Sequence, residues 1–261
     1  MPASPVFPSA LAKPERDAIT SLAPTGVLRA GINLSNSLLV SGTEATGEPR
    51  GVSPSMAAGV ADALGVPLQL VSFDSPGDLA DAVRSDRWDI GNIGADPARA
   101  GHIAFSPPYC EIESTYLVRH DSPMVTPADV DRPDVSIATK RRAAYTLWLE
   151  RNIEHAKLIQ TDTNDECLDA LAAEEVDVVA GLRPRLLIDV QRVPNGRVLD
   201  GRFAAVQQAI GTPSDRGLAG LVYLQRFVIA AIGAGFVAAL IEHHNVEGLS
   251  VARPPSIDAG R

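Results

Sequence analysis

Cysteine is scarce in this sequence, which contains Cys110 and Cys167 as its two cysteines among 261 residues. We expect them in different domains, so no structural disulfide is predicted between them. The fold must then depend on an apolar core. A hydrophobic content of 45% is enough to form one large domain or two ordinary ones.

Basic residues are also in the minority, because 23 lysines and arginines stand against 32 aspartates and glutamates, for a net charge of −9. A protein of this charge repels the phosphates of nucleic acids and the headgroups of anionic lipids. Nucleic acid is therefore not expected as a partner.

No apolar run reaches the roughly 20 residues that span a bilayer. The longest, at 227–241, contains Gly233 and Gly235, and we interpret it as two core helices that meet at a break. Membrane insertion is not predicted.

Residues 1–24 are rich in proline, and they lack the basic start and the continuous apolar stretch of a secretory signal. We expect a disordered or extended N-terminal segment. We also expect a cytoplasmic protein, or a periplasmic one if a leader has been removed.

Motifs for metal, phosphate or serine chemistry are absent from the sequence. The five histidines have no paired metal-ligand spacing, and the adjacent His243 and His244 are expected on different faces of a helix. No glycine-rich phosphate loop and no Gly-x-Ser-x-Gly elbow occurs. We predict no metal site and no cofactor.

Short apolar segments alternate with amphipathic helical patterns, which is typical of an α/β protein. The first unit runs from a strand at 27–32 through a helix at 53–64 to a strand at 68–73. Ser75 and Pro76 open the next helix as its cap and first residue, and a third strand follows at 89–93.

The same order of elements starts again after Thr126, which begins another capped turn. The strand at 203–211 then returns toward the first lobe, and apolar helices after Ser214 cover it. The remaining predicted elements are a strand at 135–138, a helix at 143–152, a capping box at 163–166 before a second helix, and a strand at 176–180. We therefore predict two βαβ lobes joined by two crossing strands.

Residues 88–118 contain two motifs with a fixed spacing. The turn Asp96-Pro97-Ala98-Arg99 follows a strand, and Phe105-Ser106-Pro107-Pro108-Tyr109 follows the turn without a gap. This order resembles the signature region of the family 3 solute-binding proteins of ABC importers. The similarity also covers 47–70 and 137–186, and it implies the two-lobed type II periplasmic-binding-protein fold.

The family's layout implies where the lobes begin and end. Ligands of such folds bind at the carboxyl ends of the strands, in the cleft where the lobes face each other. The implied parts are an N-terminal segment at 1–24, lobe 1 at 25–116, lobe 2 at 117–203, the return to lobe 1 with the C-terminal helices at 204–250, and a tail at 251–261.

Arg99 is the strongest candidate for a ligand-binding residue. The resemblance implies that its guanidinium binds a ligand carboxylate through two oxygens, since the group is planar and always charged. The alternative is a surface arginine at a helix end. Asn92, Gly94 and Asn36 are expected to line the same pocket.

In lobe 2, Lys140, Arg141 and Arg142 fall where the family has a loop at a helix N-terminus that receives an anion. Each of the three could instead project into solvent.

Leu182 stands where family members have the aspartate that holds an α-ammonium group, and an apolar residue cannot balance that charge. The predicted ligand is therefore a small carboxylate without a free α-amine.

Cys110 occupies a position where the family has an apolar or aromatic residue. Arg99 and Lys140 could lower its pKa and make it a nucleophile, while the alternative is a small buried hydrophobic residue. Glu113 is a candidate acid or base, or a solvated residue of a strand edge. We expect Cys167 in the core.

Two functions fit these residues. One is a cytoplasmic enzyme of the lyase or desulfhydrase type, similar to the desulfhydrase of ergothioneine breakdown, which acts on a thiohydantoin propionate. There Cys110 would attack the thiocarbonyl, and Lys140 or Arg141 would stabilise negative charge. The alternative is the substrate-binding protein of an ABC importer, which takes a small organic acid or amino-acid-like solute to a permease.

Overall fold

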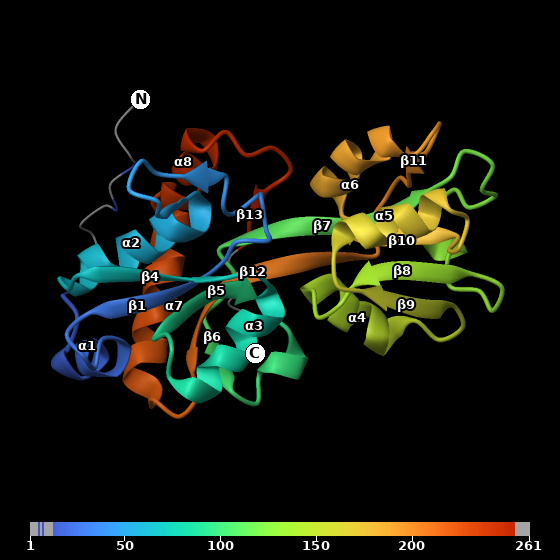
Figure 1. Cartoon of the computed structure of the whole chain (residues 1–261). Coiled ribbons are helices and arrows are strands. Elements are labelled where there is room, and N and C mark those ends of the chain that lie inside the picture. The colour runs from blue at the N-terminus through green and yellow to red at the C-terminus, as the bar shows by residue number, and fades with distance from the viewer. Residues whose placement is uncertain (1–4, 6, 8–12, 254–261) are drawn as a thin grey trace, which may run out of the picture. The chain divides into compact units, whose positions relative to one another are not determined.

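The computed structural model describes residues 5, 7 and 13–253, and the chain forms two compact units (Figure 1). Unit 1 contains residues 1–111 and 207–261, and unit 2 contains residues 112–206. The chain passes from one unit to the other inside two long strands, β7 (Cys110–Val118) and β12 (Ala204–Pro213). The predicted boundaries at 116 and 204 fall within the same two strands.

Unit 1 is built on a sheet with the strand order β4, β1, β5, β12. β1 pairs in parallel with β4 and β5, whereas β12 runs antiparallel to β5 and also pairs with β6. The elements of this unit besides β7 and β12 are α1 (Arg16–Leu22), β1 (Leu28–Asn33), β2 (Gly42–Thr43), β3 (Pro49–Arg50), α2 (Val52–Leu64), β4 (Leu68–Phe73), α3 (Pro76–Asp81), η1 (Ala82–Ser85), β5 (Ile90–Gly94), η2 (Pro97–Arg99), β6 (Ile103–Phe105), α7 (Leu218–Gly233), α8 (Phe236–His243) and β13 (Ser250–Val251).

Local sequence signals set the helix ends of unit 1, as predicted. Ser75 caps α3, because its hydroxyl accepts a hydrogen bond from the backbone N–H of Asp78 at 3.1 Å. α7 and α8 meet at Gly235, whose φ of 73° lies in the left-handed region that favours glycine. This confirms the predicted break in the apolar run.

Within residues 13–253, no single helix has the length and apolar character needed to cross a membrane. α7 and α8 pass that test as a pair, but they bend by 68° at their break.

The expectation that residues 1–24 are disordered or extended is wrong for the part that the structure describes. α1 packs on α7, with Ala18 and Leu22 buried. The ring of Phe7 stacks on Phe227 with their centroids 4.6 Å apart. These apolar contacts stabilise the segment even though its proline content is high. Residues 1–4, 6 and 8–12 lie outside the described residues.

The predicted tail at 251–261 also begins inside the fold. β13 pairs antiparallel with the start of β7, where Val251 lies opposite Cys110. Ala252 is buried, and its N–H donates to the carbonyl of Tyr109 at 3.1 Å. Residues 254–261 lie outside the described part of the chain.

Unit 2 has a sheet with the strand order β7, β10, β8, β9. β10 runs antiparallel to β7 and parallel to β8, and β8 is parallel to β9, as expected for a βαβ unit. Its elements besides β7 and β12 are η3 (Pro127–Asp129), β8 (Ser136–Lys140), α4 (Ala144–Asn152), β9 (Lys157–Thr161), α5 (Asn164–Ala172), β10 (Val178–Leu182), α6 (Arg183–Asp189), η4 (Val190–Arg192) and β11 (Arg197–Val198).

The sheet of unit 2 buries a different apolar cluster on each face. Leu149 of α4 packs with Tyr116 and Ile137 on one face. Cys167 and Leu171 of α5 belong to the cluster on the other face. The expectation that Cys167 lies in the core is therefore confirmed.

Candidate functional site

Arg99 is held at the carboxyl end of β5 in unit 1. The side chain of Asp96 caps the short helix η2 by accepting from the N–H of Ala98 at 2.9 Å. Arg99 ends this helix and is 7% exposed, and its Nη1 donates to the carbonyl of Gly94 at 2.6 Å. The structure thus brings two of the predicted site residues together, with the guanidinium fixed at the strand end where ligands of this fold class bind.

Asn92 lies two residues before Gly94 on β5, opposite Ile32 of β1 and Ile210 of β12. Its side chain is 2% exposed, and within the described residues neither its Nδ2 nor its Oδ1 has a hydrogen-bond partner. A buried amide without partners is unfavourable by about 1–3 kcal/mol. Asn92 is therefore a donor and acceptor that a bound polar molecule would satisfy.

Asn36 lies in the loop after β1, and its described contacts are local. Its Oδ1 accepts from the N–H of Leu38 at 3.2 Å, and its carbonyl accepts from the N–H groups of Leu39 and Val40. These bonds shape the loop. A role for Asn36 in ligand binding stays a prediction.

Cys110 does not have the properties of a nucleophile. It is 0% exposed at the start of β7, where β13 pairs with it. Burial, followed by the charge of Glu111, raises the pKa of the thiol well above its usual range. The predicted lowering of this pKa by Arg99 and Lys140 is wrong. The group remains a protonated thiol at neutral pH.

We expect neither cysteine to react with a thiol reagent in the folded protein. Cys110 and Cys167 are 0% and 1% exposed, and burial is the largest cause that raises the pKa of each thiol. Titration with 5,5′-dithiobis(2-nitrobenzoate) should detect almost no thiol under native conditions and both thiols in guanidinium chloride. Rapid native labelling that disappears in Cys110→Ala would contradict this description.

The basic segment of unit 2 connects β8 to α4. Lys140 ends β8, and its carbonyl accepts from the hydroxyl of Thr146 at 2.6 Å. Arg141 is exposed, and its Nε donates to Asp162 at 3.0 Å. Arg142 is exposed as well, with a φ of 60°. Of the two predictions for Arg141, the structure agrees with the one in which its side chain extends into solvent, where it pairs with Asp162.

Glu113 belongs to a group of ion pairs in unit 2. Its Oε2 accepts from Nε of Arg183 at 2.9 Å, and its Oε1 lies 3.5 Å from Nη1 of Arg202. The Glu113 side chain is 46% exposed, which agrees with the strand-edge alternative. Both carboxylate oxygens of Glu113 are therefore engaged by arginines of the same unit.

Leu182 ends β10 in an apolar environment. It packs against a cluster that includes Tyr145, Ala143 and Val206, together with the half-buried Phe203. On β7, Ser114 is the partner of Leu182 in the antiparallel ladder, so both side chains lie on the same face. This strand end presents apolar carbon and hydroxyl groups.

Ser114 was not singled out from the sequence. It is 0% exposed, and its Oγ has no hydrogen-bond partner among the described residues. The signal that could have found it is the alternation of β7, in which Ile112, Ser114 and Tyr116 share one face and the flanking two are apolar. A serine at an inward position of a strand needs a polar partner.

The described residues contain no group of three or more histidine, cysteine, aspartate or glutamate side chains arranged to hold a metal ion.

Residues 34–161 match the model of the bacterial extracellular solute-binding proteins, family 3. No curated protein matches the chain. Among solved structures, the solute receptor for L-cysteine of Neisseria gonorrhoeae is similar with a TM-score of 0.70 and 21% identity, over 90% of this chain and 99% of the receptor. A mutant of ArgBP from T. maritima is similar with a TM-score of 0.69 and 20% identity, over 88% and 100% of the two chains.

An ancestral amino acid-binding protein, a precursor of cyclohexadienyl dehydratase, is also similar, with a TM-score of 0.68 and 19% identity over 86% of this chain and 98% of that one. At these identities the structures show the fold, and the family model adds a match over a stretch that includes the motifs at 96–99 and 105–109. The chain thus has the two-lobed type II periplasmic-binding fold, and its residues 34–161 resemble the family 3 solute-binding proteins.

Proposed function

We propose that this chain is the substrate-binding protein of an ABC importer, and that Arg99 binds the carboxylate of its solute. The observation that carries the proposal is the buried guanidinium of Arg99, held at the end of β5 by the carbonyl of Gly94 at 2.6 Å. A guanidinium fixed in this way loses little conformational entropy when it binds a carboxylate through two oxygens. The orphaned amide of Asn92 supplies further polar contacts.

The solute that we propose carries no α-ammonium group. The solved relatives include a receptor for L-cysteine and an ancestral amino acid-binding protein. At the end of β10, however, this chain has Leu182 within an apolar cluster, with the neutral hydroxyl of Ser114 beside it. An ammonium group that is removed from water against such a surface has no countercharge there.

A cysteine-dependent enzyme is the less favoured function. The desulfhydrase hypothesis needs an accessible thiolate at Cys110, and this residue is 0% exposed with a raised pKa. Glu113, the second candidate for catalysis, is paired with Arg183 and Arg202. The described residues therefore support binding without a covalent step.

Calorimetric titration with matched ligand pairs tests the solute class. Each pair contains an amino acid and the same acid without its amine, for example phenylalanine with 3-phenylpropionate and histidine with imidazole propionate. We expect the deaminated member of the productive pair to bind more tightly. Tighter binding of the free amino acid would overturn the proposed solute class.

We expect Leu182→Asp to shift the preference toward the amino acid. A carboxylate at the end of β10 gives the ammonium group a charged hydrogen-bond partner, which strengthens amino acid binding by about 10-fold or more and repels the deaminated acid. Leu182→Asn is the matched control, because it has the same shape without the charge. Identical ligand preferences in wild type and Leu182→Asp would contradict the role of this position. Circular dichroism checks that both variants fold.

A further inference from the structure

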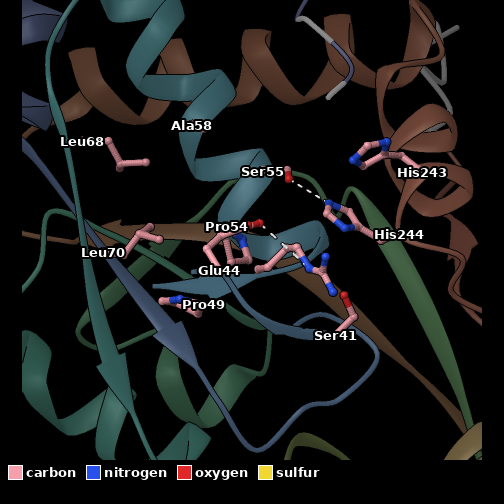
Figure 2. A pocket seen from close by; sticks show the side chains of 12 residues that line it. Ser41, Glu44, Pro49, Pro54, Ser55, Ala58, Leu68, Leu70, His243 and His244 are labelled. Carbon is pink, nitrogen blue, oxygen red and sulfur yellow. Dashed lines mark hydrogen bonds and ion pairs between the residues drawn. The ribbon is translucent and has the colours of Figure 1, made fainter. Parts of the chain in front are cut away.

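Unit 1 contains a pocket of about 540 Å³ that none of the predicted site residues lines. The β2–β3 hairpin, the first turns of α2, the outer strand β4 and the C-terminal end of α8 form its walls (Figure 2). β4 is the edge strand of the sheet in unit 1. The pocket thus lies at the rim of the unit, and Arg99, Asn92 and Asn36 are not among its lining residues.

One wall of the pocket is polar. The hydroxyl of Ser55 on α2 and Nε2 of His244 lie 2.9 Å apart, although the two residues are 189 positions apart in the sequence. The guanidinium of Arg50 belongs to the same wall, with its Nε 3.9 Å from Oε1 of Glu44. This ion pair is half-exposed, so it is weak.

The opposite wall is apolar. Figure 2 shows Leu68 and Leu70 of β4 across the pocket from Ser55 and His244, and Ala58 of α2 lies beside them. Leu68 and Leu70 are two residues apart on one strand, so their side chains leave the sheet on the same face. A cavity with a guanidinium, its partner carboxylate, an imidazole and a hydroxyl on one side and leucines on the other can take a molecule with an anionic head on Arg50 and a short apolar body.

His244 places a titratable group in this pocket. The predicted placement of His243 and His244 on different helix faces is wrong, because α8 ends at His243 and His244 lies beyond its last turn. Their rings meet edge to face with centroids 4.9 Å apart. Burial, then His243 and the charge of Arg50, lower the pKa of His244, and Glu44 opposes them.

We propose that this pocket is a second ligand site of the protein, which binds a small organic monocarboxylate on Arg50 and His244 with its apolar chain against Leu68 and Leu70. The site is independent of the carboxylate site proposed at Arg99. A bound carboxylate favours the protonated imidazole, so binding takes up a proton. Because His244 is neutral in the empty pocket at neutral pH, affinity should rise as the pH falls from about 8 to about 6.

The test uses hexanoate, acetate and inorganic phosphate as probes, with the imidazole NMR signals of His244 as the readout. We expect hexanoate to shift these signals along a saturable curve and to raise the pKa of His244. Acetate and phosphate should bind more weakly, since neither has an apolar chain of that length. Chemical shifts that do not respond to hexanoate would overturn the proposal, whether or not the protein binds acids elsewhere.

Variants separate this pocket from the site at Arg99. Arg50→Gln should weaken hexanoate binding at His244 by at least about tenfold. Arg226→Gln, which changes an exposed arginine of α7, should leave it unchanged. Arg99→Met should also leave the His244 titration unchanged. If hexanoate binding at His244 persists in Arg50→Gln, or is lost in Arg99→Met, the assignment to this pocket is wrong. The thermal unfolding midpoint of each variant reports whether it is folded.

Discussion

Replacing Arg99 by methionine is expected to weaken carboxylate binding by about 100-fold or more, while the protein stays folded. Methionine keeps much of the aliphatic length of the side chain and removes all five N–H donors. The ligand carboxylate then enters a site without its charged partner, and the remaining polar contacts cannot replace it. Calorimetric titration of wild type and variant with the best deaminated acid measures this loss.

Two further variants control this experiment. Arg226→Met removes an exposed arginine from the same unit and should leave the dissociation constant unchanged. Arg99→Lys keeps the charge without the planar group, and we expect an intermediate affinity. If Arg99→Met binds the acid as tightly as wild type, Arg99 does not hold the carboxylate.

Replacing Asp89 by asparagine is expected to lower the free energy of unfolding by about 3–5 kcal/mol, the largest loss of stability that we predict. Asp89 is 0% exposed, and its carboxylate accepts from the backbone N–H and Nε of Arg29 at 2.8 and 3.0 Å and from Nη2 of Arg29 at 2.7 Å. Arg216 donates to it as well. In the variant, the largely buried guanidinium groups of Arg29 and Arg216 lose the anion that lies between them.

Asp86→Asn is the matched control, because Asp86 binds the same two arginines while its side chain is 71% exposed. Water screens this pair, so the loss should stay below about 1 kcal/mol. Urea unfolding monitored by circular dichroism compares the two variants. Equal losses would show that burial does not decide the strength of this network.

The local elements of the fold could be predicted from the sequence because their signals lie within a few residues. The strand at 68–73 has the predicted bounds, and the helix predicted at 53–64 begins one residue earlier, at Val52. Thr163 caps α5 by accepting from the N–H of Glu166 at 3.1 Å, as the capping box predicts. Hydrogen bonds of this kind depend on neighbours in the chain, which a sequence pattern contains.

Contacts between distant residues decide the surroundings of the candidate site residues, and this is why the predicted lowering of the Cys110 pKa was wrong. Cys110 is buried, and its partner across the strand pair is Val251, a residue that was assigned to the tail. Arg141 pairs with Asp162, and Glu113 with Arg183, across strands whose register the sequence does not specify. Periodicity indicates which face of an element is apolar, but not which charged partner reaches it.

Arg99 is a different case, because the contacts that position it lie within or next to the motif at 96–99. The cap at Asp96 and the bond to Gly94 both span at most five residues. Because these contacts are local, the motif is enough to predict the backbone turn and the position of Arg99. Ser114 could not be found in this way, because its orphaned hydroxyl appears only once β7 and β10 are paired.

A crystal structure of the protein with its tightest-binding deaminated acid tests the central claim most directly. Our account predicts both carboxylate oxygens of the ligand within hydrogen-bond distance of the guanidinium of Arg99. A ligand bound with its carboxylate on other residues, and Arg99 still engaged only by the protein, would contradict it.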